Sequence, residues 1–325
     1  MLNNFMIKVP NNKKQTIEFD RETGNTLWWD TMSQNMKNIR PTFEPWEKPE
    51  GDIPPGYQEI KCHLIFDIKM GEKFCQKSRF VAGGHMTETP TTLTYASAVL
   101  RDLVRIALNI ADINGTEILS CDIQNKYLTA EFQEKIWTRA GPEFESEAGT
   151  IMIVKMALYG LKSSGAEFRA HLAKTLNDFW FLSTNADCDI WYRPAVKTTG
   201  FEYYENILCY IDDILCTYND PGIATRQIHA VFKFKGDNME QPKIYLRAQV
   251  RKMIVERAEG WYMSVDKYVS AAVENVEQNI AKSNQHFPTC CKNPIMSGYW
   301  PETDTSPELK YEGVTQYQDM VRVLR

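Results

Sequence analysis

The segment ILCYIDDILCTY, residues 207–218, constrains this chain most strongly, because two adjacent aspartates lie within an otherwise apolar and β-branched run. A solvated turn usually contains Gly, Asn, Ser or Lys, whereas Asp212 and Asp213 have isoleucine on both sides. The β-branched and apolar residues before and after the pair predict two strands joined by a turn. The segment therefore predicts a β-hairpin with two like charges at its tip.

Two carboxylates at one hairpin tip cannot both be buried as charges without a compensating cation. All-oxygen ligation favours Mg²⁺ or Mn²⁺, and one hairpin supplies too few ligands. Asp122, in the segment ILSCDI, is the natural third ligand because it too has apolar neighbours. Three carboxylates at the ends of adjacent strands can hold two ions roughly 4 Å apart, the arrangement used for in-line attack at phosphorus. The competing interpretation is a solvated turn, since a Tyr-x-Asp-Asp tetrapeptide arises by chance in roughly a few per cent of chains this long.

The composition is that of an ordinary globular protein, with 43% apolar and 24% charged residues among 325. A net charge of -5 argues against a generic nucleic-acid coat but not against a polymerase, which concentrates its basic residues in a cleft. No stretch approaches the roughly 18 consecutive apolar residues of a membrane span, and the N-terminus lacks a signal peptide's apolar region. The eight cysteines form no CxxC or zinc-spaced set, which predicts reduced thiols and an intracellular protein.

The periodicity of apolar residues predicts a mixed α+β core with helical material on its C-terminal side. The helices are expected over residues 25–39, 95–115, 164–179, about 222–234 and around 269–280. The strands are expected as a hairpin within 59–83 that turns at 71–73, and over 117–128, 188–195 and 244–255. Residues 1–25 are polar and expected to be loosely ordered, and 44–58 form a linker rich in Pro and Gly.

Five segments resemble, in order, the motifs of copia-type retrotransposon reverse transcriptases. They are KSRFVAGG (77–84), CDIQNKYLTA (121–130), EKIWTRAGPEF (134–144), VKMALYGLKSSGAEF (154–168) and YIDD (210–213). The resemblance extends from about residue 25 to about 285. It implies a right-hand polymerase fold of fingers, palm and thumb, with an antiparallel palm sheet that carries the YIDD hairpin.

The resemblance also implies a division of the chain. Residues 1–24 are an N-terminal polar segment, and 25–285 form the reverse transcriptase domain. Within it we expect fingers at about 59–94, a palm at about 95–218 and a thumb or connection at about 219–285. Residues 286–325 are a C-terminal extension that stops before the ribonuclease H domain expected downstream.

The implied function is RNA-directed DNA polymerisation, in which dNMP is added to a primer 3′-OH by two-metal phosphoryl transfer. The implied cofactors are two Mg²⁺ (or Mn²⁺) ions per site. The expected partners are an RNA or DNA template with its primer, dNTPs and other parts of a retrotransposon polyprotein, with no membrane. The location implied is a cytoplasmic particle or the nucleus.

By the same resemblance, Asp122, Asp212 and Asp213 are the catalytic, metal-binding carboxylates. Tyr127 matches the aromatic steric gate that excludes a ribose 2′-OH, although without the resemblance an ordinary strand aromatic is the better interpretation. Tyr210 is expected to pack beneath the aspartate pair and to orient the template–primer end.

Four further residues are implied to bind substrate. Lys77 and Arg79 would contact the incoming triphosphate, with a solvated basic edge strand as the alternative. Lys162 and Ser163 match the floor of the nucleotide pocket.

Three departures from the family pattern weigh against activity. Lys126 stands where the family usually has Ala, and Arg247 stands where it strongly prefers Gly. Ser163 and Gly165 replace the common Gln and Pro. The alternative function is therefore a catalytically impaired remnant that keeps the fold and some affinity for nucleic acid. An unrelated metal-dependent phosphohydrolase is a third hypothesis, which leaves Tyr127 and the KSRFVAGG segment unexplained.

Overall fold

The computed structural model describes residues 8–47, 55–69, 75–90, 94–236, 239–246, 248–255 and 258–282, with a few more between 305 and 318. The chain divides into two compact units, Met1–Pro242 and Lys243–Arg325. The helices of the first unit are α1 (Lys13–Thr23), α2 (Leu27–Ile39), α3 (Arg101–Asn114), α4 (Ser164–Asp178) and α5 (Pro221–His229), with a 3₁₀ turn, η3, at Lys126–Thr129. Its strands are β1 (Phe43–Pro45), β2 (Gln58–Ile60), β3 (Cys62–Lys69), β4 (Cys75–Ala82), β5 (Glu117–Asp122), β6 (Ile136–Arg139), β7 (Ile151–Val154), β8 (Leu182–Ser183), β9 (Ile190–Val196), β10 (Glu202–Tyr210) and β11 (Asp213–Tyr218).

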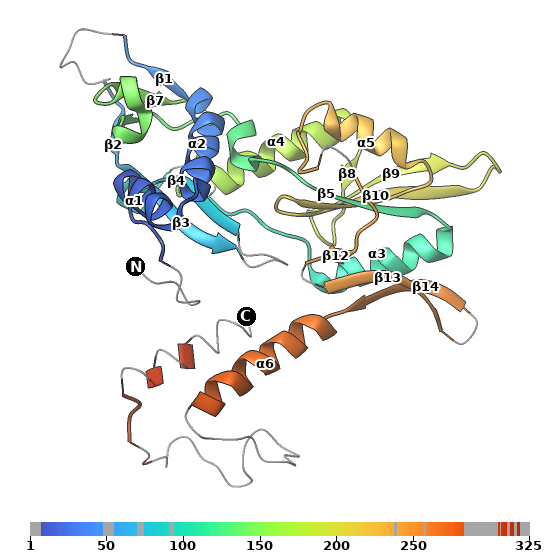
Figure 1. Ribbon diagram of the computed structural model, residues 1–325. Helices are drawn as coiled ribbons and strands as arrows, with labels where there is room; N and C mark the ends of the chain where they lie inside the picture. The colour runs from blue at the N-terminus through green and yellow to red at the C-terminus, as the bar shows by residue number, and fades with distance from the viewer. Residues whose placement is uncertain are drawn as a thin grey trace. The chain divides into compact units, whose positions relative to one another are not determined.

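A five-stranded antiparallel sheet in the order β5-β11-β10-β9-β8 forms the centre of the first unit. Helices α4 and α5 lie on one face of this sheet and α3 lies on the other (Figure 1). On β11, Ile214 and Cys216 join the core cluster that contains residues of α4, and Leu215 alternates to the opposite face. Because both faces of β11 are covered, its sequence is a continuous apolar run, as in other doubly buried strands.

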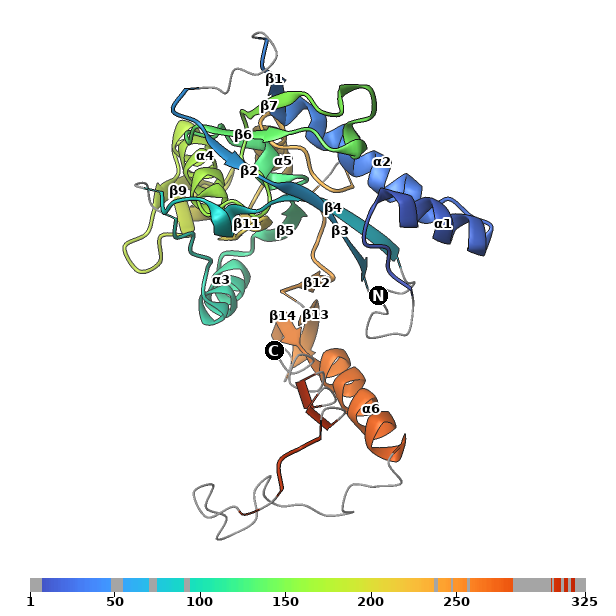
Figure 2. The ribbon, with the colours of Figure 1, turned by 90° about the vertical axis from the view of Figure 1, so that its left-hand side faces the viewer.

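The hairpin of β3 and β4 packs against α2, as Figure 2 shows from the side. The alternation along β4 buries Ser78, Phe80 and Ala82, which leaves Lys77 and Arg79 on the other face. Two hydrogen bonds fix this strand to α2. The Ser78 hydroxyl donates to the Thr31 carbonyl at 2.8 Å, and the Phe80 N–H donates to Asn35 Oδ1 at 2.8 Å. Helix α2 thereby sets which face of β4 carries the two basic residues.

We expect Asn35→Ala to lower the free energy of unfolding by about 1–2 kcal/mol, because it leaves the Phe80 N–H without its acceptor in a buried strand. Chemical denaturation measures the change. The matched control is Gln34→Ala, since Gln34 is bonded only to Asn38 on the exposed side of the same helix. Equal effects of the two substitutions would contradict a bracing role for Asn35.

Helix α1 corrects the expectation that the polar N-terminal residues are loosely ordered. Asn12 caps the helix by accepting the Gln15 N–H at 3.0 Å, and Gly24 ends it at φ 67°. The buried Asp20 carboxylate accepts the backbone N–H groups of Trp28 and Trp29, at 3.0 and 2.8 Å. Caps and one buried carboxylate stabilise this helix, and an apolar stripe, the usual sequence signal of a helix, is absent from its polar sequence.

Two other predicted helices have different limits in the structure. Helix α3 begins at Arg101 and not at 95, because the Val99 N–H donates to the Cys209 carbonyl at 3.1 Å and holds that segment extended. Its end agrees with the predicted limit at 115, where Gly115 adopts a left-handed conformation, φ 55° and ψ 46°. Helix α5 ends at His229 and not at 234. Beyond it, Phe232 and Phe234 are both buried, and the chain runs along β5.

The helices predicted over 25–39, after 163 and around 269–280 are confirmed as α2, α4 and α6. The turn predicted at 71–73 lies outside the described residues, whereas the flanking strands β3 and β4 are present.

The second unit contains an antiparallel sheet of β12 (Ile244–Tyr245), β13 (Ala248–Val255) and β14 (Ala258–Ser264), followed by α6 (Asp266–Lys282). Strand β14 was not predicted. Arg247, whose bulk was singled out in the sequence, lies outside the described residues. In the part of the chain that the structure describes, every helix is too short or too polar to cross a bilayer.

Candidate active site

The aspartate pair lies at the tip of the hairpin formed by β10 and β11. Tyr210 is opposite Asp213 in the strand register, so Ile211 and Asp212 form a two-residue turn. Ile211 has a φ of 60°, a region that β-branched residues rarely adopt and that hairpins usually fill with Gly or Asn. Such strain persists only where the surrounding structure enforces it, and it is concentrated at functional sites. The turn is thus a candidate site on backbone geometry alone.

Asp122 meets the pair from the neighbouring strand. Strands β5 and β11 are antiparallel with Asp122 directly opposite Asp213, so both side chains leave the same face of the sheet. The Ile123 N–H donates to the Asp212 carbonyl at 2.9 Å and ties the end of β5 to the turn. The structure therefore brings the three predicted carboxylates together at one end of the central sheet.

Two lysines contact these carboxylates. Lys126, only 9% exposed, places its Nζ 3.0 Å from Asp212 Oδ1. Lys235 bonds Asp122 through Oδ2. The other oxygen of Asp122, Oδ1, is buried and has no hydrogen-bond partner among the described residues. An orphaned, buried carboxylate oxygen beside two further acids is the kind of group that a bound cation would satisfy.

The crowding of negative charge is visible in Asp213. Burial first, and then the charges of Asp212 and Asp122, raise the pKa of Asp213 to about 6. Lys235 and Lys126 act in the opposite direction but do not cancel the effect. Asp213 therefore holds its proton more tightly than an ordinary aspartate, chiefly because it is buried and then because two acids lie beside it.

A pH-dependent stability follows from this raised pKa. The folded state holds the Asp213 proton up to about pH 6, whereas the unfolded state releases it near its ordinary value of 3.8. Between these values the folded state binds more protons, so the free energy of unfolding falls as the pH rises through the window. Asp213→Asn, which removes the charge, should stabilise the metal-free protein by about 1 kcal/mol above pH 6, after discounting for solvent screening at a half-buried group.

Thermal melts at pH 4 and pH 7.5 in a metal chelator measure this effect, with exposed Asp178→Asn as the control. The gain should be present at pH 7.5 and should vanish at pH 4. A gain of equal size at both pH values would mean that Asp213 is not the group that titrates.

Tyr127 lies next to the acids on η3. Asn125, at φ 52°, turns the chain before it, and the Tyr127 ring then packs edge-to-face on Tyr159 with centroids 4.8 Å apart and on Phe168 at 6.4 Å. Burial and then the Asp212 charge raise the pKa of Tyr159 to about 12, and Arg79 lowers it. The charge of Arg79 therefore acts on the Tyr159 hydroxyl, as Asp212 and Tyr127 also do. Lys77 lies two residues before Arg79 on the same face of β4.

Lys162 and Ser163 make contacts with the protein itself. Lys162 Nζ donates to the Thr87 carbonyl at 2.6 Å, and the buried Ser163 hydroxyl donates to Glu134. They immediately precede α4, whose Gly165 and Arg169 line a hollow together with Ile211 of the hairpin turn. Tyr210 is half-buried at the end of β10. Lys162 and Ser163 therefore position the start of α4 beside the hairpin.

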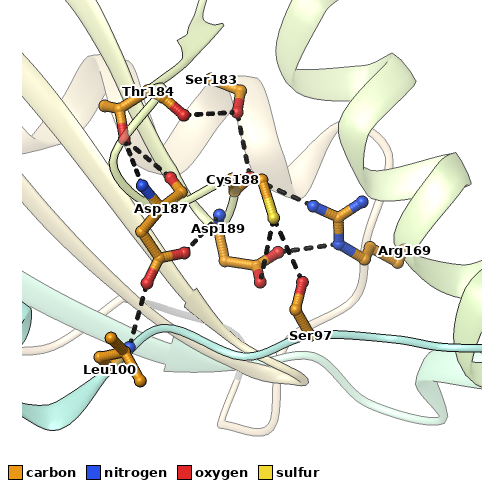
Figure 3. A network of polar contacts seen from close by, with 8 residues as sticks. All are labelled: Ser97, Leu100, Arg169, Ser183, Thr184, Asp187, Cys188 and Asp189. Carbon is orange, nitrogen blue, oxygen red and sulfur yellow. Dashed lines mark hydrogen bonds and ion pairs between the residues drawn. The ribbon is translucent and has the colours of Figure 1, made fainter.

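A second acidic group lies near the site, at residues 187–189. Asp187, Cys188 and Asp189 form, among the described residues, the group of three potential metal ligands whose atoms lie within 4.8 Å of one another. Their polar atoms are already used (Figure 3). Asp189 accepts from Arg169 Nε at 2.9 Å, and Asp187 accepts from the Asp189 N–H at 2.9 Å and the Leu100 N–H at 3.2 Å. This group joins β9 to α4 and to the start of α3, which is a structural role.

The carboxylates of Asp122, Asp212 and Asp213 fit a divalent cation better than the 187–189 group does. They supply only oxygen donors, which Mg²⁺ prefers, and one of these oxygens is buried without a partner. Lysines bond two of the three acids, and the oxygens of the three acids do not all lie within 4.8 Å of one another. The three carboxylates thus fit a metal ion, although a lysine ammonium group bonds Asp212 and another bonds Asp122.

Sequence reasoning missed two residues at this site. Lys235 reaches Asp122 because the segment after α5 is bonded to β5, with the Lys235 N–H donating to the Asp122 carbonyl at 2.9 Å. The signal was the alternation in Lys233-Phe234-Lys235, which is typical of an extended segment. Tyr159 was quoted within a motif but was given no role.

Comparison with known proteins agrees with this geometry. A family model described as reverse transcriptase (RNA-dependent DNA polymerase) matches residues 50–290, which include all three acids. A curated relative from Arabidopsis thaliana, "Retrovirus-related Pol polyprotein from transposon RE1", is 23% identical over 225 residues. The matched segment covers 66% of this chain and only 15% of that relative. The chain belongs to the reverse transcriptase (RNA-dependent DNA polymerase) family and is a reverse transcriptase domain of the retrotransposon kind.

Proposed function

We propose that this chain is a template-directed DNA polymerase of the copia type, which copies RNA by adding dNMP to a primer 3′-OH. The observation that carries the proposal is the register of the central sheet. Asp122 lies opposite Asp213, with Asp212 in the adjoining turn, all within the region that matches the family. Two strands and a turn thus deliver three carboxylates to one place, as a metal-dependent phosphoryl transfer requires.

The proposal gives each of these side chains a role. Asp122, Asp212 and Asp213 would hold the divalent ions that reverse transcriptases generally use, Mg²⁺ or Mn²⁺. Ions held there would supply activation of the primer hydroxyl and neutralisation of the charge that develops on the leaving pyrophosphate. Arg79 and Lys77, presented on one face of β4, would bind the triphosphate oxygens. Tyr127, fixed by Tyr159 and Phe168, would lie under the sugar and exclude a 2′-OH.

We assign the β3–β4 hairpin to the fingers, the five-stranded sheet with α3 and α4 to the palm, and the segments that follow β11 to the thumb or connection. Template–primer and dNTPs are the proposed ligands. Other parts of a retrotransposon polyprotein are the proposed partners, in a cytoplasmic particle or the nucleus.

A specific observation favours a second candidate, a catalytically impaired remnant that still binds nucleic acid. Lysines bond two of the three acids, and one of them, Lys126, stands where the family usually has Ala. If these contacts cannot open, the site binds template–primer without catalysis.

Primer extension separates the two candidates. The intact chain is incubated with an RNA template, a DNA primer, dNTPs and Mg²⁺ or Mn²⁺, beside Asp212→Asn. Extension by the intact chain and none by the variant supports the polymerase. Binding of template–primer without extension supports the remnant, and extension that persists in Asp212→Asn contradicts the metal site.

A further inference from the structure

We propose that Lys126 is a resident counter-ion of the metal site, so that a divalent cation binds by displacing its ammonium group from Asp212. The inference deepens the proposed function, because it requires that Asp212 bind metal. Lys126 departs from the family pattern. Its contact with Asp212 should weaken metal binding even though all three aspartates are present.

The burial of Lys126 sets it apart from ordinary surface lysines. Its side chain is 11% exposed, and its Nζ lies 3.0 Å from Asp212 Oδ1 and 4.9 Å from the centroid of the Tyr127 ring. The lysine end of the ion pair is therefore buried beside the aromatic ring, whereas Asp212 keeps 29% of its side chain exposed. A buried lysine that loses its partner is left with an uncompensated charge, which is costly.

The local backbone directs the lysine into this position. Asn125 has left-handed dihedrals, φ 52° and ψ 40°, a conformation that Asn tolerates better than most residues. The Lys126 carbonyl then accepts the Thr129 hydroxyl at 2.7 Å, which closes the 3₁₀ turn. Lys126 is held at both ends, by its backbone and by Asp212.

Lys235 differs in its freedom to leave. Its ammonium bonds Asp122, but its side chain is 53% exposed, so it can turn into solvent at little cost. Lys126 is only 11% exposed and has the Tyr127 ring beside its ammonium group, so turning it into solvent costs more. The displacement of Lys126 is therefore the step that limits metal affinity, and Lys235 adds a weaker competitor.

The size of the effect follows from the population of the open state. A ligand that binds only a minor conformation has its apparent dissociation constant raised by the inverse of that fraction. If the lysine-free state makes up about 1–10% of molecules, metal affinity is weakened about 10- to 100-fold. Replacing Lys126 by an uncharged residue should recover that factor.

The first test uses the unaltered chain. Lysine acetylation by an N-hydroxysuccinimide ester is measured by mass spectrometry with and without Mn²⁺. We expect the labelling rate of Lys126 to rise at least fivefold when Mn²⁺ is bound. Lys174, which pairs with Asp178 on the exposed face of α4, should not change. A constant rate at Lys126 under saturating Mn²⁺ overturns the inference.

The second test measures Mn²⁺ binding directly, from the free-ion signal in electron paramagnetic resonance. Lys126→Met should tighten the Mn²⁺ dissociation constant at least tenfold, whereas the control Lys174→Met should leave it unchanged. The same variant should melt at a lower temperature in chelator and regain more stability on adding Mn²⁺ than the unaltered chain does. Lys126→Arg keeps the positive charge and serves as a second variant if Lys126→Met does not fold. It should bind Mn²⁺ as weakly as the unaltered chain.

Asp212→Asn separates the failure of the inference from the failure of the proposed function. If Asp212→Asn loses Mn²⁺ binding while Lys126→Met binds no more tightly than the unaltered chain, the metal site stands and Lys126 is not its counter-ion. If Asp212→Asn binds Mn²⁺ as the unaltered chain does, the metal site itself is wrong and the inference falls with it.

Discussion

Asp122→Asn should lower the rate of dNMP incorporation about a thousandfold, although its carboxylate lies 90 residues before the Asp pair. The substitution keeps the shape of the side chain and removes its charge at the place where Asp213 is directly opposite. Electrostatic groups that act on developing charge commonly contribute two to three orders of magnitude to the rate, and a missing metal ligand belongs in this class.

Single-turnover primer extension measures this change, with Asp178→Asn as the control because Asp178 is exposed and pairs with Lys174 on the surface of α4. Asp122→Asn should still bind template–primer, because it removes a negative charge that repels the phosphates of the nucleic acid. A loss smaller than tenfold would mean that Asp122 is not a ligand and that only the hairpin carries the chemistry.

Tyr127→Val should raise the use of ribonucleotides relative to deoxyribonucleotides by about a hundredfold. The ring is held in place by Tyr159 and Phe168 and so cannot move aside for a 2′-OH. Steric exclusion by a fixed group can supply discrimination that hydrophobic binding alone cannot. Val removes the ring and leaves a smaller apolar side chain in its place.

The selectivity is measured as the ratio of kcat/KM for rNTP and dNTP. Tyr204→Val is the control, since Tyr204 is an exposed tyrosine on β10 of the central sheet. If both substrates lose the same factor in Tyr127→Val, Tyr127 supports the packing of η3 and does not choose the sugar.

The hairpin that carries the aspartate pair could be predicted because local sequence determines it. Strand β11 is buried on both faces, which made its apolar run conspicuous and left Asp212 and Asp213 as the exceptions. Asp122 was found by the same contrast between a charge and its apolar neighbours. Lys77 and Arg79 were singled out by the family resemblance, and in the structure both lie on one face of β4.

The remaining features depend on contacts between distant segments, which periodicity does not report. Lys235 reaches Asp122 only because the chain after α5 runs along the free edge of β5. The direction of Lys126 depends on the left-handed backbone of Asn125. Helix α1 depends on caps and on the buried carboxylate of Asp20, and its polar sequence predicted a loose segment.

Iron-mediated cleavage tests most directly whether a metal binds at the hairpin. Fe²⁺ replaces Mg²⁺ in the intact chain, and ascorbate with peroxide then generates hydroxyl radicals that cut the backbone near the bound ion. We predict cuts close to residue 122 and residues 211–213, suppressed by excess Mg²⁺ and absent in Asp212→Asn. Cuts confined to residues 187–189, the other acidic group, would contradict the account.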